Sequence, residues 1–151
     1  MNIRSMAALA LFVLTLAACT AEEKKPLTVG ESKDFGSVCD KANDGKRVAI
    51  EGYLRFPDEV TVKNSVVLRL YPTNEFNGQP VGVSSFPFGT GPHHLAMIPK
   101  NYMDSDLKLT TADGQVAPYR TKVKVSGDVY YPTVGQTFQC ALSNPLVELA
   151  K

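Results

Sequence analysis

Two segments of the chain share a pattern that constrains the fold more than any other feature. Residues Arg47 to Pro57 read RVAIEGYLRFP, and residues Lys122 to Pro132 read KVKVSGDVYYP. Each begins with a basic residue, places apolar side chains at alternate positions and ends at a proline. Period-two alternation is typical of a half-buried β-strand. Gly52 and Gly127 lie mid-strand, where a glycine often marks a bulge or a bend at a barrel corner. The pattern therefore predicts two long, bent strands of a small closed barrel.

Shorter strands are predicted between and after this pair. The candidates are Ser65 to Tyr71, Pro80 to Phe86, Leu107 to Thr111, Gln115 to Tyr119 and Thr137 to Leu149, the last interrupted at Asn144-Pro145. The Asp113-Gly114 pair predicts a hairpin turn. Residues 34 to 44 are expected to form one or two helical turns. Residues 87 to 106, which begin with several glycines and prolines, are expected to form a loop with at most one helical turn.

The number and order of these strands resemble the OB-fold. The stretches VAIEGYL (48–54) and VKVSGDV (123–129) look like the V-x-V-x-G-x-V strands of small OB-like domains, including exported bacterial ones. The resemblance covers residues 36 to 149. It implies an all-β fold, a five- to six-stranded OB-like barrel with one short N-terminal helix. An SH3-like barrel and a β-sandwich are the alternatives, because any twisted antiparallel barrel favours the same pattern.

The N-terminal residues have the features of an export signal. Arg4 supplies a positive charge, and the uncharged run from Met6 to Leu16 has the length of a signal-peptide hydrophobic region. It is too short to span a bilayer, which needs roughly 20 apolar residues. Leu16-Ala17-Ala18-Cys19 then resembles the lipobox of bacterial lipoprotein precursors. The resemblance implies a signal peptide of residues 1 to 18 and lipidation of Cys19. The alternative is an ordinary secretory signal that happens to precede a cysteine.

The residues after this motif predict how the domain is attached. Residues 19 to 35 are polar with no apolar period, so they are expected to be a lipidated tether to a barrel domain of residues 36 to 151. In lipoproteins of enteric-type bacteria, an aspartate after the lipidated cysteine signals retention at the inner membrane. Thr20 at this position implies transfer to the outer membrane. The expected location is therefore the periplasmic face of the outer membrane, with the membrane as partner through the lipid anchor.

The cysteine count predicts one disulfide. The chain has three cysteines, and lipidation of Cys19 leaves Cys39 and Cys140, an even number in an oxidising compartment. We therefore expect a bond between Cys39 and Cys140, with two buried free thiols as the alternative. The bond would close a loop of about 100 residues, for which the chain-entropy model gives up to about 4 to 5 kcal/mol.

Charge and motif content argue against several classes of function. Without Arg4, the mature chain carries 15 basic and 15 acidic residues, so it lacks the basic surplus of nucleic-acid-binding domains. The two histidines, His93 and His94, are adjacent in a loop and are expected to be solvated rather than to bind a metal. No G-x-S-x-G elbow is present, and no cysteine is left as a nucleophile. We expect no enzyme activity, cofactor or metal. An enzyme would require a histidine to converge with Asp104 or Asp106 in a pocket.

A binding role rests on the second and third strands of OB-like barrels, whose outer face binds ligands. The outward residues predicted there are Tyr53, Arg55, Arg69 and Tyr71, residue types that bind sugars, peptides or bases well. The competing interpretation is that such residues simply suit an exposed strand face. Phe76, Phe86 and Phe88 form a second aromatic group, expected in the core, with a lid or a partner patch as the alternatives.

Two functional hypotheses follow from these observations. One is a binding or adaptor lipoprotein that presents the barrel face to an envelope protein, peptide or glycan, and it predicts an exposed aromatic and basic patch. The other is a structural or stress-related envelope protein without a small ligand, and it predicts an evenly polar surface with the phenylalanines buried.

Overall fold

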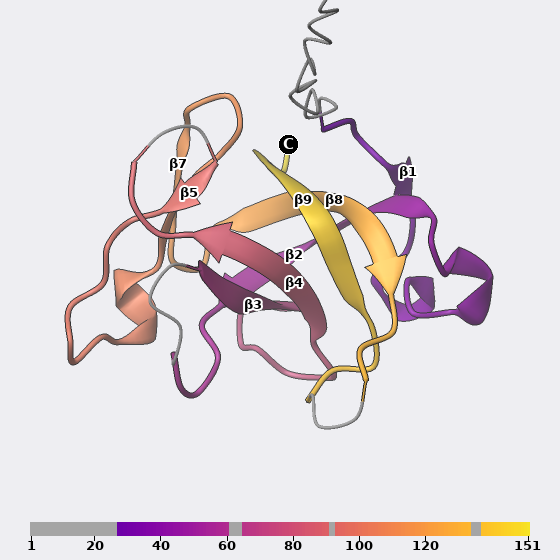
Figure 1. Cartoon of the computed structure of the whole chain (residues 1–151), viewed down its shortest axis with the longest axis horizontal. Coiled ribbons are helices and arrows are strands. Elements are labelled where there is room, and N and C mark those ends of the chain that lie inside the picture. The colour runs from indigo at the N-terminus through magenta and orange to yellow at the C-terminus, as the bar shows by residue number, and fades with distance from the viewer. Residues whose placement is uncertain (1–26, 61–64, 91–92, 134–136) are drawn as a thin grey trace, which may run out of the picture.

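A computed structural model describes residues 27–60, 65–90, 93–133 and 137–151 of the chain, and its regular elements are strands and short 3₁₀ turns (Figure 1). The strands are β1 (Glu31–Ser32), β2 (Arg47–Arg55), β3 (Ser65–Tyr71), β4 (Val81–Pro87), β5 (His94–Leu95), β6 (Lys108–Thr110), β7 (Val116–Pro118), β8 (Lys122–Tyr130) and β9 (Ala141–Leu149). The 3₁₀ turns are η1 (Phe35–Ser37), η2 (Lys41–Asn43) and η3 (Asp104–Asp106).

Five of the strands form a closed barrel. The order is β2-β3-β4-β9-β8, and β2 pairs with β8 to complete the circle. Within the barrel β4 and β9 run parallel, whereas the other four neighbours are antiparallel. This architecture confirms the all-β, OB-like barrel. The predicted N-terminal helix takes the form of the two turns η1 and η2.

The two mid-strand glycines, Gly52 and Gly127, lie where a neighbouring strand approaches too closely for a side chain. β2 pairs with β8 up to Tyr53 and with β3 from Tyr53 onward, so the strand changes partner beside Gly52. A Cβ atom on Gly52 would lie 2.4 Å from the carbonyl oxygen of Tyr71. At Gly127, where the β8–β9 register shifts, a Cβ would lie 2.7 Å from the Cβ of Leu142. Only hydrogen fits at either position, and the register shift at Gly127 confirms the predicted irregularity in β8.

The barrel interior holds the alternate apolar positions predicted from the pattern. Residues at most 5% exposed include Val48, Ile50, Leu54, Phe56, Val66, Leu68, Leu70, Val123, Val125 and Val129. Among the phenylalanines, Phe86 is fully buried and Phe88 packs against the core, as predicted. Phe76 is different, because it lies partly exposed in the loop between β3 and β4.

The N-terminal segment is fastened to the barrel in two ways. Cys39 and Cys140 form the predicted disulfide, with their Cα atoms 5.4 Å apart, so the segment between η1 and η2 is joined to the start of β9. Before it, β1 pairs in parallel with β2 at Val48 and Ala49, inside the range predicted as tether. A Cβ on Gly30 would lie 2.3 Å from the backbone carbon of Val48, which shows how closely this segment approaches β2.

A second, three-stranded sheet lies between β4 and β8 in the chain. β6 and β7 form the hairpin predicted at Asp113-Gly114, and β5 adds to its edge through His94 and Leu95. The segment predicted as a loop thus contributes a short strand besides the single turn η3. This segment also brings the residues around Asp104 against the end of β2.

Candidate functional site

The four residues predicted on the basis of strand alternation form one patch on the outer face of β2 and β3. Tyr53 lies opposite Tyr71, and Arg55 lies opposite Arg69 in the antiparallel register. Directly opposed residues project to the same side of a sheet, and the intervening pair, Leu54 and Leu70, is buried in the core. The structure therefore brings all four predicted side chains together. Tyr71 differs from the prediction of an exposed face, because it is buried, at 7% exposure, where Phe76 packs edge-on against it.

Each arginine of this patch is held by a carboxylate from a neighbouring loop. Arg55 donates from Nε to Oδ2 of Asp104 over 2.7 Å, and Arg69 donates from Nη1 to Oδ2 of Asp58 over 2.9 Å. The hydrogen bond to Asp104 raises the pKa of Arg55 further above its ordinary value. Like charges directly opposite one another would destabilise the strand pair. The two carboxylates offset this repulsion and fix both guanidinium groups in place.

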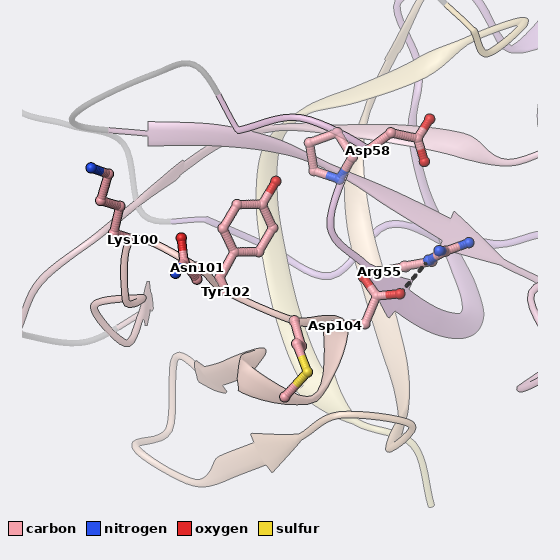
Figure 2. A pocket seen from close by; sticks show the side chains of 8 residues that line it. Arg55, Asp58, Lys100, Asn101, Tyr102 and Asp104 are labelled. Carbon is pink, nitrogen blue, oxygen red and sulfur yellow. Dashed lines mark hydrogen bonds and ion pairs between the residues drawn. The ribbon is translucent and has the colours of Figure 1, made fainter.

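A hollow of about 420 Å³ adjoins the patch beside Arg55 (Figure 2). Its polar lining consists of Arg55, Asp58, Lys100, Asn101, Tyr102 and Asp104. The Tyr102 hydroxyl accepts a hydrogen bond from the Val60 amide over 2.9 Å, which leaves its own proton free to donate. The hollow thus presents cationic, anionic and neutral polar groups within one concave surface.

On the other side of Arg55, three aromatic rings form a cluster that the sequence did not reveal. The Phe76 and Tyr119 rings stack, with centroids 5.5 Å apart and planes at 21°, and Tyr71 meets Phe76 edge-on. The guanidinium carbons of Arg55 and Arg120 lie 5.6 and 5.8 Å from the Phe76 centroid. We define the aromatic–arginine cluster as these five residues. Tyr119 and Arg120 come from the turn between β7 and β8, and no pattern in that turn signals their approach to Phe76.

The histidines are placed differently from the prediction of solvated loop residues. His93 is partly buried, packs its ring edge-on against Phe86 with centroids 5.0 Å apart, and accepts a hydrogen bond on Nε2 from the Val147 amide. Burial lowers the pKa of His93 below its ordinary value. The nearest polar side chain recorded for His94 is Thr110, with Oγ1 3.5 Å from Nε2. Of the two acids considered as partners, Asp104 is bound to Arg55, and Asp106 accepts a hydrogen bond from the Met103 amide.

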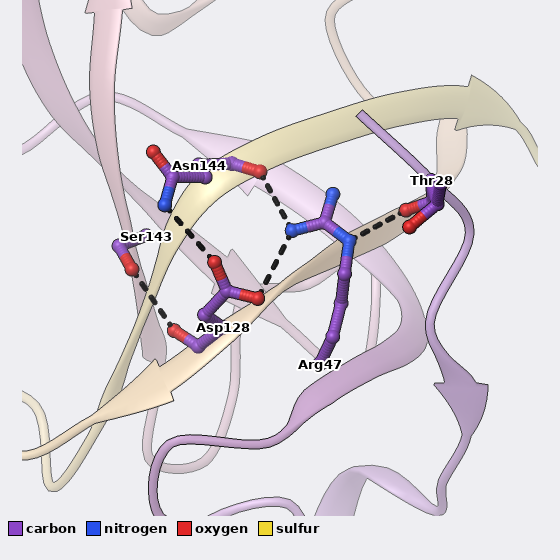
Figure 3. Close-up of polar contacts among 5 residues, drawn as sticks. All are labelled: Thr28, Arg47, Asp128, Ser143 and Asn144. Carbon is purple, nitrogen blue, oxygen red and sulfur yellow. Dashed lines mark hydrogen bonds and ion pairs between the residues drawn. The ribbon is translucent and has the colours of Figure 1, made fainter. Parts of the chain in front are cut away.

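A separate polar network anchors the residues that precede β1 (Figure 3). Arg47 donates from Nε to the carbonyl of Thr28 over 2.6 Å, and from Nη1 to both Asp128 Oδ1 and the Asn144 carbonyl. Asn144 completes the ring by donating from Nδ2 to the second oxygen of Asp128 over 3.0 Å. This network determines where the N-terminal segment leaves the barrel.

The predicted export signal, the lipobox and Cys19 lie outside the described residues. Across the part of the chain that is described, no helix is long and apolar enough to cross a membrane. Within the same residues, no group of three or more His, Cys, Asp or Glu side chains could hold a metal ion.

Comparison of the chain with protein-family models, with curated proteins and with solved structures finds no match.

Proposed function

We propose that this chain is a membrane-anchored lipoprotein of the bacterial cell envelope whose barrel is a binding or adaptor module. In this proposal Cys19 carries the lipid, the residues that follow it tether the domain, and the domain faces the periplasm from the outer membrane. The lipobox supports the anchor. The Cys39–Cys140 bond fits an oxidising compartment.

The observation that carries the binding role is the patch of Tyr53, Arg55, Arg69 and Tyr71 together with the hollow beside it. Ligand sites are concave and combine aromatic surface with a few well-placed polar groups. Here the polar groups are oriented by ion pairs rather than left to sample many rotamers. The exposure of Phe76 also supports a binding role. The alternative, a structural envelope protein, predicts that the phenylalanines are buried, whereas Phe76 is partly exposed.

The anchor is tested by intact mass of the protein made in a lipoprotein-competent bacterium. The expected mass corresponds to a chain that begins at Cys19 and carries acyl groups. A matched Cys19→Ser variant should lack them and should leave the membrane fraction. A mature chain that begins elsewhere, or a wild-type protein without acyl groups, would refute the anchor.

The binding role is tested by photo-crosslinking in living cells. A photoreactive phenylalanine replaces Tyr53 on the patch or, as the control, exposed Lys41 on η2. We expect an adduct of defined mass at position 53 and none at position 41, because only the first lies on the proposed face. Equal crosslinking at both positions, or none at position 53, would argue for a barrel without a ligand.

A further inference from the structure

The exposed side chain of Arg120 is supported by two aromatic rings. Its guanidinium carbon lies 5.4 Å from the Tyr119 centroid and 5.8 Å from the Phe76 centroid. Distances of this kind are cation–π contacts, which use none of the five N–H donors of the guanidinium group. The two rings therefore hold this cation without consuming its hydrogen-bonding capacity.

Arg120 also differs from the other described arginines in its charge partners. Arg47, Arg55 and Arg69 each bind an aspartate within 3.2 Å. Among the described residues, no carboxylate lies within ion-pair distance of Arg120, and no hydrogen bond from its side chain is recorded. The cluster thus holds one exposed cation that no described carboxylate compensates.

The backbone is strained at both residues that build this arrangement. Phe76 has φ of 59° and Arg120 has φ of 63°, in the left-handed region that glycine ordinarily occupies. A bulky residue in this region is unfavourable and persists where the surrounding structure imposes it, often at functional sites. Phe76 and Arg120 lie in two loops that are far apart in the sequence. In each loop the residue with positive φ is the one whose side chain contacts the other loop.

Arg55 connects this cation to the hollow. It contacts Phe76 on one side and binds Asp104 at the rim of the hollow on the other. The lining of the hollow includes both donors, such as Lys100 and Arg55, and acceptors, such as Asp58 and Asp104. Hydroxyl groups both donate and accept, so a polyhydroxylated ligand matches this lining better than a group that can only accept.

We propose that the aromatic–arginine cluster and the adjoining hollow bind an acidic saccharide. The carboxylate of a uronic-acid-type sugar accepts two hydrogen bonds from the outer edge of Arg120, and the hydroxyl groups of the same or the next sugar reach the hollow. The inference rests on the proposed binding role and names its ligand class. An acidic peptide is the competing occupant. It would share the carboxylate but not the hydroxyl groups, so the test distinguishes the two.

The test measures binding to the detergent-solubilised full chain by calorimetry. The probes are an α-1,4-linked tetragalacturonate, its methyl ester, which keeps the sugar and removes the charge, and hexaglutamate. We expect the tetragalacturonate to bind most tightly and its affinity to fall with added salt. Methyl esterification and the Arg120→Gly variant should each weaken binding by about ten- to a hundredfold, as for the loss of charge-assisted hydrogen bonds.

Arg120→Gly separates binding from folding, because glycine accepts the observed φ without strain and the variant should retain or gain thermal stability. Arg120→Lys keeps the charge but loses the two-point geometry, so it should bind more weakly than wild type. Lys41→Ala removes one distant exposed cation and should bind as wild type does. Equal affinity for the acid and its ester, or an unaffected Arg120→Gly variant, would overturn the proposal. Preference for hexaglutamate would overturn the saccharide class, and adducts at position 53 would then still support a binding face.

Discussion

Removing the Cys39–Cys140 bond should destabilise the domain substantially. The two cysteines are separated by 101 positions, so the bond closes nearly the whole folded chain. For a loop of this length the chain-entropy model gives about 4.7 kcal/mol at 25 °C, which is an upper figure because residual structure in the unfolded chain reduces it. We expect the free energy of unfolding to fall by about 2 to 5 kcal/mol, the range measured for native disulfides of small secreted domains.

The measurement is urea unfolding of the oxidised wild type, the reduced wild type and a Cys39→Ala/Cys140→Ala variant. The chain has no tryptophan, so circular dichroism and tyrosine fluorescence provide the signals. Reduction removes the cross-link and keeps both sulfur atoms, whereas the double variant also loses their packing around Cys140, which is fully buried. Both altered forms should show a larger urea dependence, because the unfolded chain expands. A reduced wild type within about 0.5 kcal/mol of the oxidised form would refute the loop-closure argument.

Three further predictions concern the barrel, the N-terminal network and the partly buried His93. Gly52→Ala would place a methyl group 2.4 Å from a carbonyl oxygen of β3, so it should lower the free energy of unfolding by about 1 to 3 kcal/mol in a urea denaturation assay. As the control, Gly36→Ala should have little effect in the same assay, because open space surrounds Gly36. Arg47→Ala removes the hydrogen bond to the segment before β1, so amide exchange of residues 28 to 33 should accelerate about tenfold, and unchanged protection there would contradict the anchoring role. Because burial lowers the pKa of His93, the unfolded chain binds a proton there more readily, and stability should fall as pH drops below 6.5. His93→Asn, a residue type that tolerates the observed φ of 59°, should flatten this dependence, and an equally steep pH profile in the variant would assign the effect to another group.

Much of the barrel could be predicted because its determinants are local. The predicted range of β3 is the same as the observed strand. β2 begins at Arg47 and β8 begins at Lys122, the basic residues that open the two segments of similar pattern. Strand alternation also assigned Tyr53, Arg55, Arg69 and Tyr71 to one face, since side-chain direction in a strand depends only on position along it. The disulfide was predicted from the cysteine count, once the lipobox resemblance had assigned Cys19 to lipidation.

The contacts that complete the candidate site could not be predicted, because they join loops with no pattern of their own. Asp104 reaches Arg55 from η3, which lies 49 residues away in the chain. β1 was hidden within a polar segment, since it is held by backbone pairing and by Arg47 rather than by apolar side chains.

The sequence by itself determined the barrel strands, the positions of their mid-strand glycines and the residues of the outer face, because each depends on spacing along one strand, and it left two cysteines to pair. Only the tertiary structure decided that Phe76, Tyr119 and Arg120 meet beside Arg55 and that a hollow opens next to them. The physical reason is that the conformation of a loop depends on what it packs against in the folded barrel. Side chains on separate loops acquire neighbours that no local pattern encodes.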